Sequence, residues 1–192
     1  MDEERQVELI QQVMGASHLF SSSMTDLVER SIAEASDHQV SVGQAKLLFL
    51  ISRPGRRLKV MDVAVYLGVT NAAASRAVDR LVQQGLVART PTPEDRRAVD
   101  LTLTPPGKTL LVRFLEVRNQ KLLHLYRRHS PEKLAQAAAL LDELSVPAFG
   151  PAVEPDERCL HCGIHIRGTC FLRDTGRECL VAGALESSRD EE

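Results

Sequence analysis

The chain has 192 residues, of which 43% are hydrophobic, and a formal net charge of −2. This composition is ordinary for a globular protein with one main domain and a small appendage. No apolar run approaches the roughly 18 residues that span a bilayer, and the acidic start Met1 to Glu4 is the reverse of a secretory signal. The sequence therefore predicts a cytoplasmic protein with no membrane partner.

Residues 1–40 are predicted to form one long amphipathic helix. Apolar residues recur there mostly three or four positions apart, with one wider gap. Gly15 and the serines at 21–23 are places where this helix can be interrupted. The apolar positions are Val7, Ile10, Val13, Phe20, Met24, Leu27 and Ile32.

A helix-turn-helix is predicted to follow. Val42 to Ser52 has the pattern of an apolar helix that Pro54-Gly55 stops, and Leu58 to Val60 that of a short strand. Met61 to Leu67 is then the first helix of the motif, and Gly68-Val69 turns the chain into the second.

The second helix of the motif has the composition of a helix that enters a DNA groove. Thr70 can N-cap it, and its first turns carry small side chains together with the polar and basic tips of Asn71, Ser75 and Arg76. Small side chains let a helix lie deep in a major groove about 12 Å wide. Gly85 is expected to end the helix, because glycine adopts the left-handed C-cap conformation easily.

A two-stranded wing is predicted directly after this helix. Residues 86–89 and 98–104 have the pattern of short strands, and the loop 91–97 between them is rich in proline and arginine. Such a hairpin can contact the phosphate backbone beside the helix. Residues 41–104 are therefore interpreted as a winged helix-turn-helix, and the protein as a DNA-binding regulator.

The charges are distributed in a way that favours DNA binding. From Arg53 to Asp100 there are nine basic and five acidic residues, which gives +4 for this segment. Since the whole chain carries −2, the remainder carries −6. Affinity for phosphate depends on the local surface, and a basic face on an acidic body is typical of a dimeric regulator.

Two further helices are expected in residues 105–148, the first starting at Pro105-Pro106-Gly107 and the second at Ser130-Pro131-Glu132. Together with residues 1–40, they are more apolar than one small winged domain can bury. This excess favours a homodimer held by the N- and C-terminal helices. A two-fold dimer places two recognition helices about 34 Å apart and requires a pseudo-palindromic operator in double-stranded DNA.

Residues of the wing and of the helix-turn-helix carry a family resemblance. They are Asp95-Arg96-Arg97, Leu101 to Thr104 and Gly107 in the wing, and Leu67 to Thr70 and Leu81 to Val87 upstream. In these residues, and in the order of elements over about residues 3–148, the chain resembles the MarR (multiple antibiotic resistance regulator) family. The resemblance implies a mainly α fold with a small β-wing, dimerisation helices at both ends and a repressor function.

Eight residues are candidates for DNA contact. Arg76 can pair bidentately with guanine or bind a phosphate, and Arg80 can reach DNA or pair locally with Asp79. The resemblance implies that Asp95 holds Arg97 by a salt bridge while an arginine, Arg96 or Arg97, enters the minor groove, whose negative potential attracts it. The set is Thr70, Asn71, Ser75, Arg76, Arg80, Asp95, Arg96 and Arg97.

The C-terminal part of the chain is predicted to be a separate cysteine-rich segment. Residues 149–157 form a linker, residues 158–185 hold all four cysteines, and residues 186–192 are polar, acidic and expected to be disordered. Cys159, Cys162, Cys170 and Cys179 are separated by two, seven and eight residues. Clustered cysteines in a cytoplasmic protein indicate a metal site rather than a disulfide framework.

Four thiolates suit zinc or an iron–sulfur cluster. One tetrahedral zinc ion is the simpler interpretation, while an iron–sulfur cluster and metal-free redox thiols stay open as alternatives. With four cysteines present, His161 and His165 are expected to be surface groups or neighbours of the metal ligands rather than ligands themselves. A metal centre would also supply the folding energy of a segment that has few large apolar side chains.

Taken together, these patterns predict a dimeric, sequence-specific transcriptional regulator. Its affinity for DNA would respond to a small ligand or to the state of the cysteine centre. The alternative is a winged-helix adaptor that binds an acidic protein and carries a structural metal site. A glycine-rich phosphate loop, a Ser/His/Asp arrangement and paired carboxylates are all lacking, so an enzyme is not expected.

Overall fold

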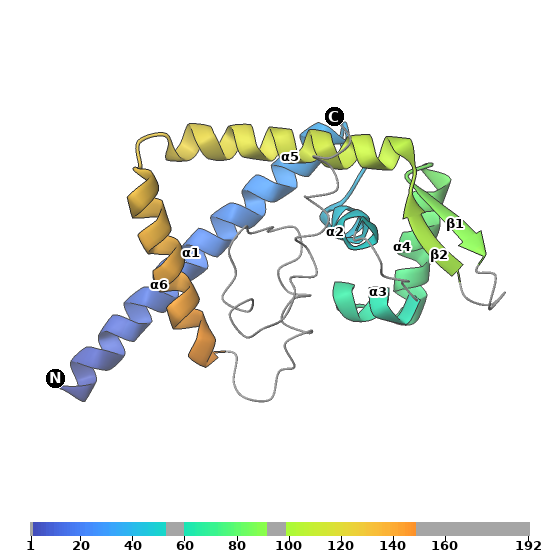
Figure 1. Ribbon diagram of the computed structural model, residues 1–192. Helices are drawn as coiled ribbons and strands as arrows, with labels where there is room; N and C mark the ends of the chain where they lie inside the picture. Colours follow the sequence, from blue (N-terminus) through green and yellow to red (C-terminus); the bar gives the residue numbers. More distant parts are fainter. Residues whose placement is uncertain (1, 53–59, 92–98, 149–192) are drawn as a thin grey trace.

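The computed structural model describes residues 2–52, 60–91 and 99–148, which form a mainly helical structure with a small two-stranded sheet (Figure 1). In these ranges, no helix is both long and apolar enough to cross a bilayer. The elements are α1 (Glu3–Ala35), α2 (Val42–Ile51), α3 (Val60–Leu67), α4 (Asn71–Gln83), β1 (Val87–Pro91), β2 (Val99–Leu103), α5 (Pro105–Tyr126) and α6 (Pro131–Ala148).

Helix α1 is continuous over 33 residues, so the interruption expected near Gly15 or the serines is wrong. Hydroxyl groups that could compete with the helix instead bond to its preceding turn: Ser23 Oγ donates to the Leu19 carbonyl at 2.9 Å, and Thr25 Oγ1 to the Ser21 carbonyl at 3.0 Å. These hydroxyl groups therefore bond within α1 and do not interrupt it. Its end is marked by positive φ angles at Asp37 and His38.

The hydrophobic core lies under the helix-turn-helix and takes in only the C-terminal part of α1. Helix α2 is apolar except at Gln44 and Lys46, and its apolar residues are buried among α1, α3, α4 and α5. Phe49 of α2 and Phe114 of α5 meet edge to face, with ring centroids 5.5 Å apart. The largest fully buried side chains are Leu47, Leu48, Leu50, Leu81, Val63, Val78 and Ser31.

The wing is an antiparallel hairpin in which Val87 lies opposite Leu103 and Pro91 opposite Val99. Pro91 was expected in the loop, but it is the last residue of β1. A proline lacks an N–H donor, which a strand of a two-stranded sheet tolerates more easily than a central strand does. The short strand expected at residues 58–60 is wrong at Val60, which begins α3, while residues 58 and 59 lie outside the described ranges.

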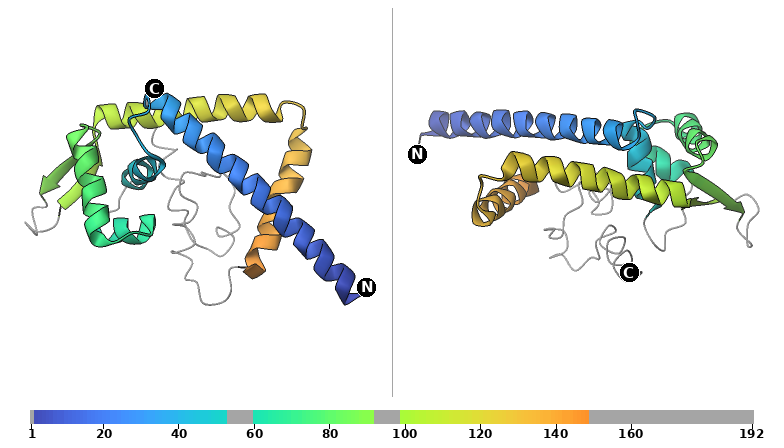
Figure 2. Two further views of the ribbon diagram at one scale, coloured as in Figure 1. Left: turned by 180° about the vertical axis from the view of Figure 1, so that it is seen from behind. Right: turned by 90° about the horizontal axis from the view of Figure 1, so that it is seen from above.

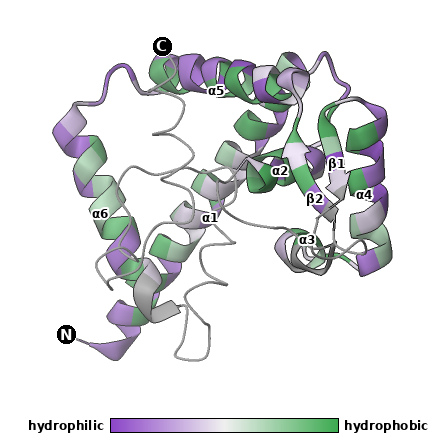
Figure 3. Ribbon diagram, turned by 45° about the vertical axis from the view of Figure 1, so that its right-hand side comes forward, coloured by the Kyte–Doolittle hydropathy of each residue, from purple (hydrophilic) through white to green (hydrophobic). Residues whose placement is uncertain are grey.

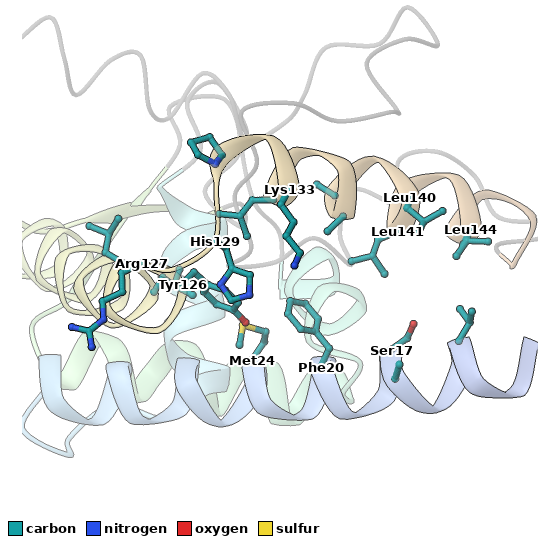
Figure 4. A pocket seen from close by; sticks show the side chains of 18 residues that line it. Ser17, Phe20, Met24, Tyr126, Arg127, His129, Lys133, Leu140, Leu141 and Leu144 are labelled. Carbon is teal, nitrogen blue, oxygen red and sulfur yellow. The ribbon is translucent and has the colours of Figure 1, made fainter. Parts of the chain in front are cut away.

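Helices α1, α5 and α6 extend away from the helix-turn-helix, and Figure 2 shows α1 and α5 side by side with the wing at the end of α5 opposite α6. Many large apolar side chains there are exposed. Figure 3 shows that α1 and α6 carry hydrophobic residues along their length, between hydrophilic ones. An open groove of about 1040 Å³ lies among these helices. Figure 4 shows Phe20 and Met24 of α1 on one side of it, and Leu140, Leu141 and Leu144 of α6 on the other.

Candidate nucleic-acid interface

The recognition helix α4 begins at a well-formed cap. Thr70 has extended backbone angles, and its hydroxyl accepts a hydrogen bond from the Ala73 N–H at 3.3 Å, which confirms it as the N-cap. Gly68 makes the preceding turn with φ +64°. The first turn of α4 contains no acidic residue, so the positive end of the helix dipole can face a phosphate.

Helix α4 has one buried stripe and one exposed face. Ala74, Val78 and Leu81 have fully buried side chains, at the spacing of one helical face. At 100° per residue, Arg76 lies almost opposite this stripe and is exposed. Arg80 lies on the flank of the same exposed face and is exposed too. The two guanidinium groups therefore point away from the core.

Two of the predicted contact residues lie nearer to the buried stripe. Asn71 is exposed at the start of α4, and Ser75 is half-buried one turn further on. Both sit in the N-terminal half of the helix, which is the part that reads base edges in helix-turn-helix proteins. The structure thus places Asn71, Ser75, Arg76 and Arg80 on α4 and Thr70 at its N-cap. Their contacts with DNA stay predictions.

An ion pair joins the recognition helix to the wing. Arg89 Nη2 of β1 lies 2.8 Å from Asp79 Oδ1 of α4, with the two side chains 38% and 45% exposed. Sequence reasoning offered Arg80 as the local partner of Asp79 and missed Arg89. Asp79 and Arg89 are ten positions apart, one on a helix and the other on a strand. Their opposite charge was the only sign of this pair in the sequence. Among the described residues, Arg76 and Arg80 form no salt bridge.

Helix α4 ends at a glycine in the left-handed conformation, as the sequence predicts. Gly85 has φ +70° and donates to the Val82 carbonyl at 2.9 Å, while the Leu86 N–H reaches the Leu81 carbonyl at 2.9 Å. These two bonds form a Schellman motif, in which the left-handed position favours glycine. The chain then enters β1 directly, so the end of the recognition helix sets the start of the wing.

The other predicted site residues lie outside the described ranges. They are Asp95, Arg96 and Arg97 of the wing loop and the four cysteines Cys159, Cys162, Cys170 and Cys179. In the part of the chain that is described, no group of three or more His, Cys, Asp or Glu side chains could hold a metal ion. The wing arginines and the metal centre therefore stay predictions.

A capped recognition helix with exposed arginines, followed at once by an antiparallel wing, defines the class of winged-helix DNA-binding proteins. Residues 38–98 match the MarR family. In an alignment of 139 residues that covers 66% of this chain and 88% of the relative, the chain is 30% identical to the HTH-type transcriptional repressor MdtR of Bacillus subtilis (strain 168). The chain belongs to the MarR family of transcription regulators, which are non-enzymatic DNA-binding proteins, so the expectation of no enzyme activity is confirmed.

Solved structures show the same fold. The crystal structure of RV1404 from Mycobacterium tuberculosis matches with a TM-score of 0.62 at 24% identity, over 76% of this chain and 97% of that one. A mutant of MepR from Staphylococcus aureus, bound to an oligodeoxyribonucleotide, matches with a TM-score of 0.52 at 20% identity, over 71% of this chain and 97% of that one.

Proposed function

We propose that this protein is a dimeric, sequence-specific transcriptional repressor. The observation that carries the proposal is the placement of Arg76 opposite the buried stripe of α4, on a helix that the Asp79–Arg89 ion pair ties to the wing. One helix and one hairpin held together in this way can engage two adjacent grooves of a duplex. The relative MdtR is named a repressor, and the MepR mutant is bound to an oligodeoxyribonucleotide.

The roles of the individual side chains follow from their places on α4. The N-terminal half of the helix enters the major groove, where Arg76 pairs with guanine and Asn71 and Ser75 reach neighbouring base edges or phosphates. Thr70 acts mainly as a cap, and Arg80 contacts the backbone. For the residues between β1 and β2, which lie outside the described ranges, the proposal follows the MarR resemblance: Asp95 pairs with Arg97, and Arg96 or Arg97 enters the minor groove.

A second copy of the chain is proposed to cover the groove among α1, α5 and α6. Leucine side chains that line this groove are exposed to solvent rather than buried in the core; Leu123 is 73% exposed and Leu140 is 55% exposed. A contiguous apolar surface of this extent marks an interaction site. Packing of the terminal helices of two subunits would bury it and would set the distance between the two recognition helices.

The four cysteines at positions 159, 162, 170 and 179 are proposed to hold one metal centre. The clustering of all four thiols in 21 residues supports this. Zinc is favoured, with an iron–sulfur cluster as the alternative. A change in this centre, or a small ligand, would then alter operator affinity through the relative placement of the two subunits.

Binding of duplexes from the promoter of the chain's own gene tests the repressor proposal. Fluorescence anisotropy should show specific binding that weakens steeply between 50 and 200 mM salt, as phosphate contacts require. For the tail, metal analysis and an absorption spectrum of anaerobically purified protein distinguish stoichiometric zinc from a coloured iron–sulfur cluster. Operator affinity that is unchanged by chelation and by oxidation would leave the cysteine centre with a structural role only.

A further inference from the structure

The C-cap residue of the recognition helix, Gln84, bonds to the segment that joins α1 to α2. Its Nε2 donates to the Gln39 carbonyl at 3.0 Å, in the turn after α1, and its Oε1 accepts from Gln44 Nε2 at 3.1 Å. These contacts span 45 and 40 positions of sequence. The side chain of Gln84 thus connects the end of α4 to the end of α1 and to the first turn of α2.

The orientation of each amide in this set is fixed. Gln44 belongs to a capping box in which its Oε1 accepts from the Ser41 N–H at 2.9 Å, so only its Nε2 can face Gln84. Rotating the Gln84 amide by half a turn would place nitrogen against nitrogen at Gln44 and oxygen against oxygen at Gln39. The hydrogen bonds therefore admit one arrangement.

The same end of α4 is bonded to α5 on its other side. Thr104, the N-cap of α5, donates its hydroxyl to the Gly85 carbonyl at 2.6 Å and its N–H to the Leu86 carbonyl at 3.1 Å. Figure 1 shows the end of α4 beside the start of α5. Residues 84–86 are thus attached both to the turn after α1 and to the start of α5, the helices that the proposed dimer uses.

We propose that Gln84 is a positioning residue for operator recognition, an inference that rests on the proposed function. The apolar stripe of α4 holds the helix on the core without fixing its direction closely, because hydrophobic contact is not directional. The hydrogen bonds of the Gln84 side-chain amide are directional, and they hold α4 at a set angle to α1. In a dimer, this angle sets the distance between the two recognition helices, and so the spacing of half-sites that is accepted.

Gln84→Glu tests this role, with Gln83→Glu as the matched control. Glutamate keeps the shape of Gln84 and can accept from Gln44, but its carboxylate cannot donate to the Gln39 carbonyl. Gln83 is exposed at the same end of α4, has no side-chain hydrogen bond to a described residue, and gains the same charge on substitution. At 100° per residue Gln83 lies within about 20° of Arg76 around α4, so its added charge faces DNA at least as directly as a charge at position 84 does. Weaker binding by Gln84→Glu than by Gln83→Glu then reports the lost hydrogen bond rather than repulsion from DNA.

The probes are the duplex that wild-type protein selects from a random library, and the same duplex with one base pair inserted between its half-sites. Gln84→Glu should bind the selected duplex about three- to tenfold more weakly than Gln83→Glu does, as expected for the loss of the hydrogen bond to the Gln39 carbonyl. The ratio of its affinities for the original duplex and for the duplex with the inserted base pair should also be smaller than that of Gln83→Glu. A loss of folding alone would lower the affinities for the two duplexes by the same factor. Gln84→Met keeps the length of the side chain but removes both of its hydrogen bonds, so it should show the same weaker spacing preference.

Equal affinities and equal spacing preference for the Gln84→Glu and Gln83→Glu variants, with a wild-type chain that does select a duplex, would overturn the positioning role alone. A wild-type chain that selects no duplex from the library contradicts the proposed function, and the positioning role with it.

Discussion

Asp79 of the recognition helix and Arg89 of the wing form an ion pair at 2.8 Å, which joins the two DNA-facing elements outside the hydrophobic core. Both side chains are more than one third exposed, so water and salt screen their attraction. The pair therefore acts more on the geometry between helix and wing than on overall stability.

A double-mutant cycle of Asp79→Ala and Arg89→Ala should give a coupling free energy of about 0.2–1 kcal/mol in the stability of the fold. Urea denaturation at low salt measures it, and 1 M NaCl should reduce it. The matched cycle of Asp79→Ala with Arg80→Ala should give a coupling near zero, because Asp79 pairs with Arg89 instead. A larger coupling to Arg80 would show that the local partner is the real one.

Arg76→Ala should weaken operator binding by about 5- to 150-fold, the range of 1–3 kcal/mol for a lost bidentate base contact. The loss should be concentrated on one base pair of the operator. Fluorescence anisotropy with wild-type and singly substituted duplexes measures it. Arg128→Ala is the control, since Arg128 is an exposed arginine in the turn that follows α5. Figure 1 shows that this end of α5 lies far from α4.

If Arg76 instead binds a phosphate, Arg76→Ala lowers affinity by the same factor for all duplexes. The slope of log affinity against log salt concentration then becomes shallower by about 1. An affinity equal to that of Arg128→Ala would remove Arg76 from the interface altogether.

The parts of the fold that the sequence predicted are those with local signals. The N-cap at Thr70 and the glycine stop at Gly85 each depend on the conformation of one residue and its nearest neighbours. Alternation of apolar residues placed the wing strands within two residues of their observed ends. These local rules sufficed to place the recognition helix and its exposed residues.

The errors arose where tertiary context overrides local preference. Val60 belongs to a short apolar run whose pattern fits either a strand or a helix. The run forms helix α3, in which Val63 and Ala64 are buried in the core. The partner of Asp79 and the bonds of Gln84 could not be predicted, because they join residues on different elements. Pattern reading locates a helix, but the contacts that orient it are non-local.

Gly107→Ala should destabilise the fold by about 1–3 kcal/mol. A Cβ at this position would collide with the backbone carbonyl oxygen of Leu86, which cannot move without breaking its bond to Thr104. Thermal or urea denaturation measures the change. Gly43→Ala, whose Cβ would meet only the Ser41 hydroxyl at 4.0 Å, should be neutral or slightly stabilising. Similar stabilities of the two variants would show that α5 can shift away from β1.

Leu141→Asp should weaken the dimer by at least about tenfold, because a carboxylate would then be buried against apolar side chains of the partner. Leu141 lines the groove on α6 and is 39% exposed in the single chain, so the substitution leaves the helix-turn-helix core untouched (Figure 4). Sedimentation velocity over a concentration series measures the monomer fraction. The control Gln136→Asp adds the same charge to an exposed position of α6 outside the groove, and it should remain dimeric. A Leu141→Asp protein with the dissociation constant of its control would show that the groove is not the surface through which two chains meet.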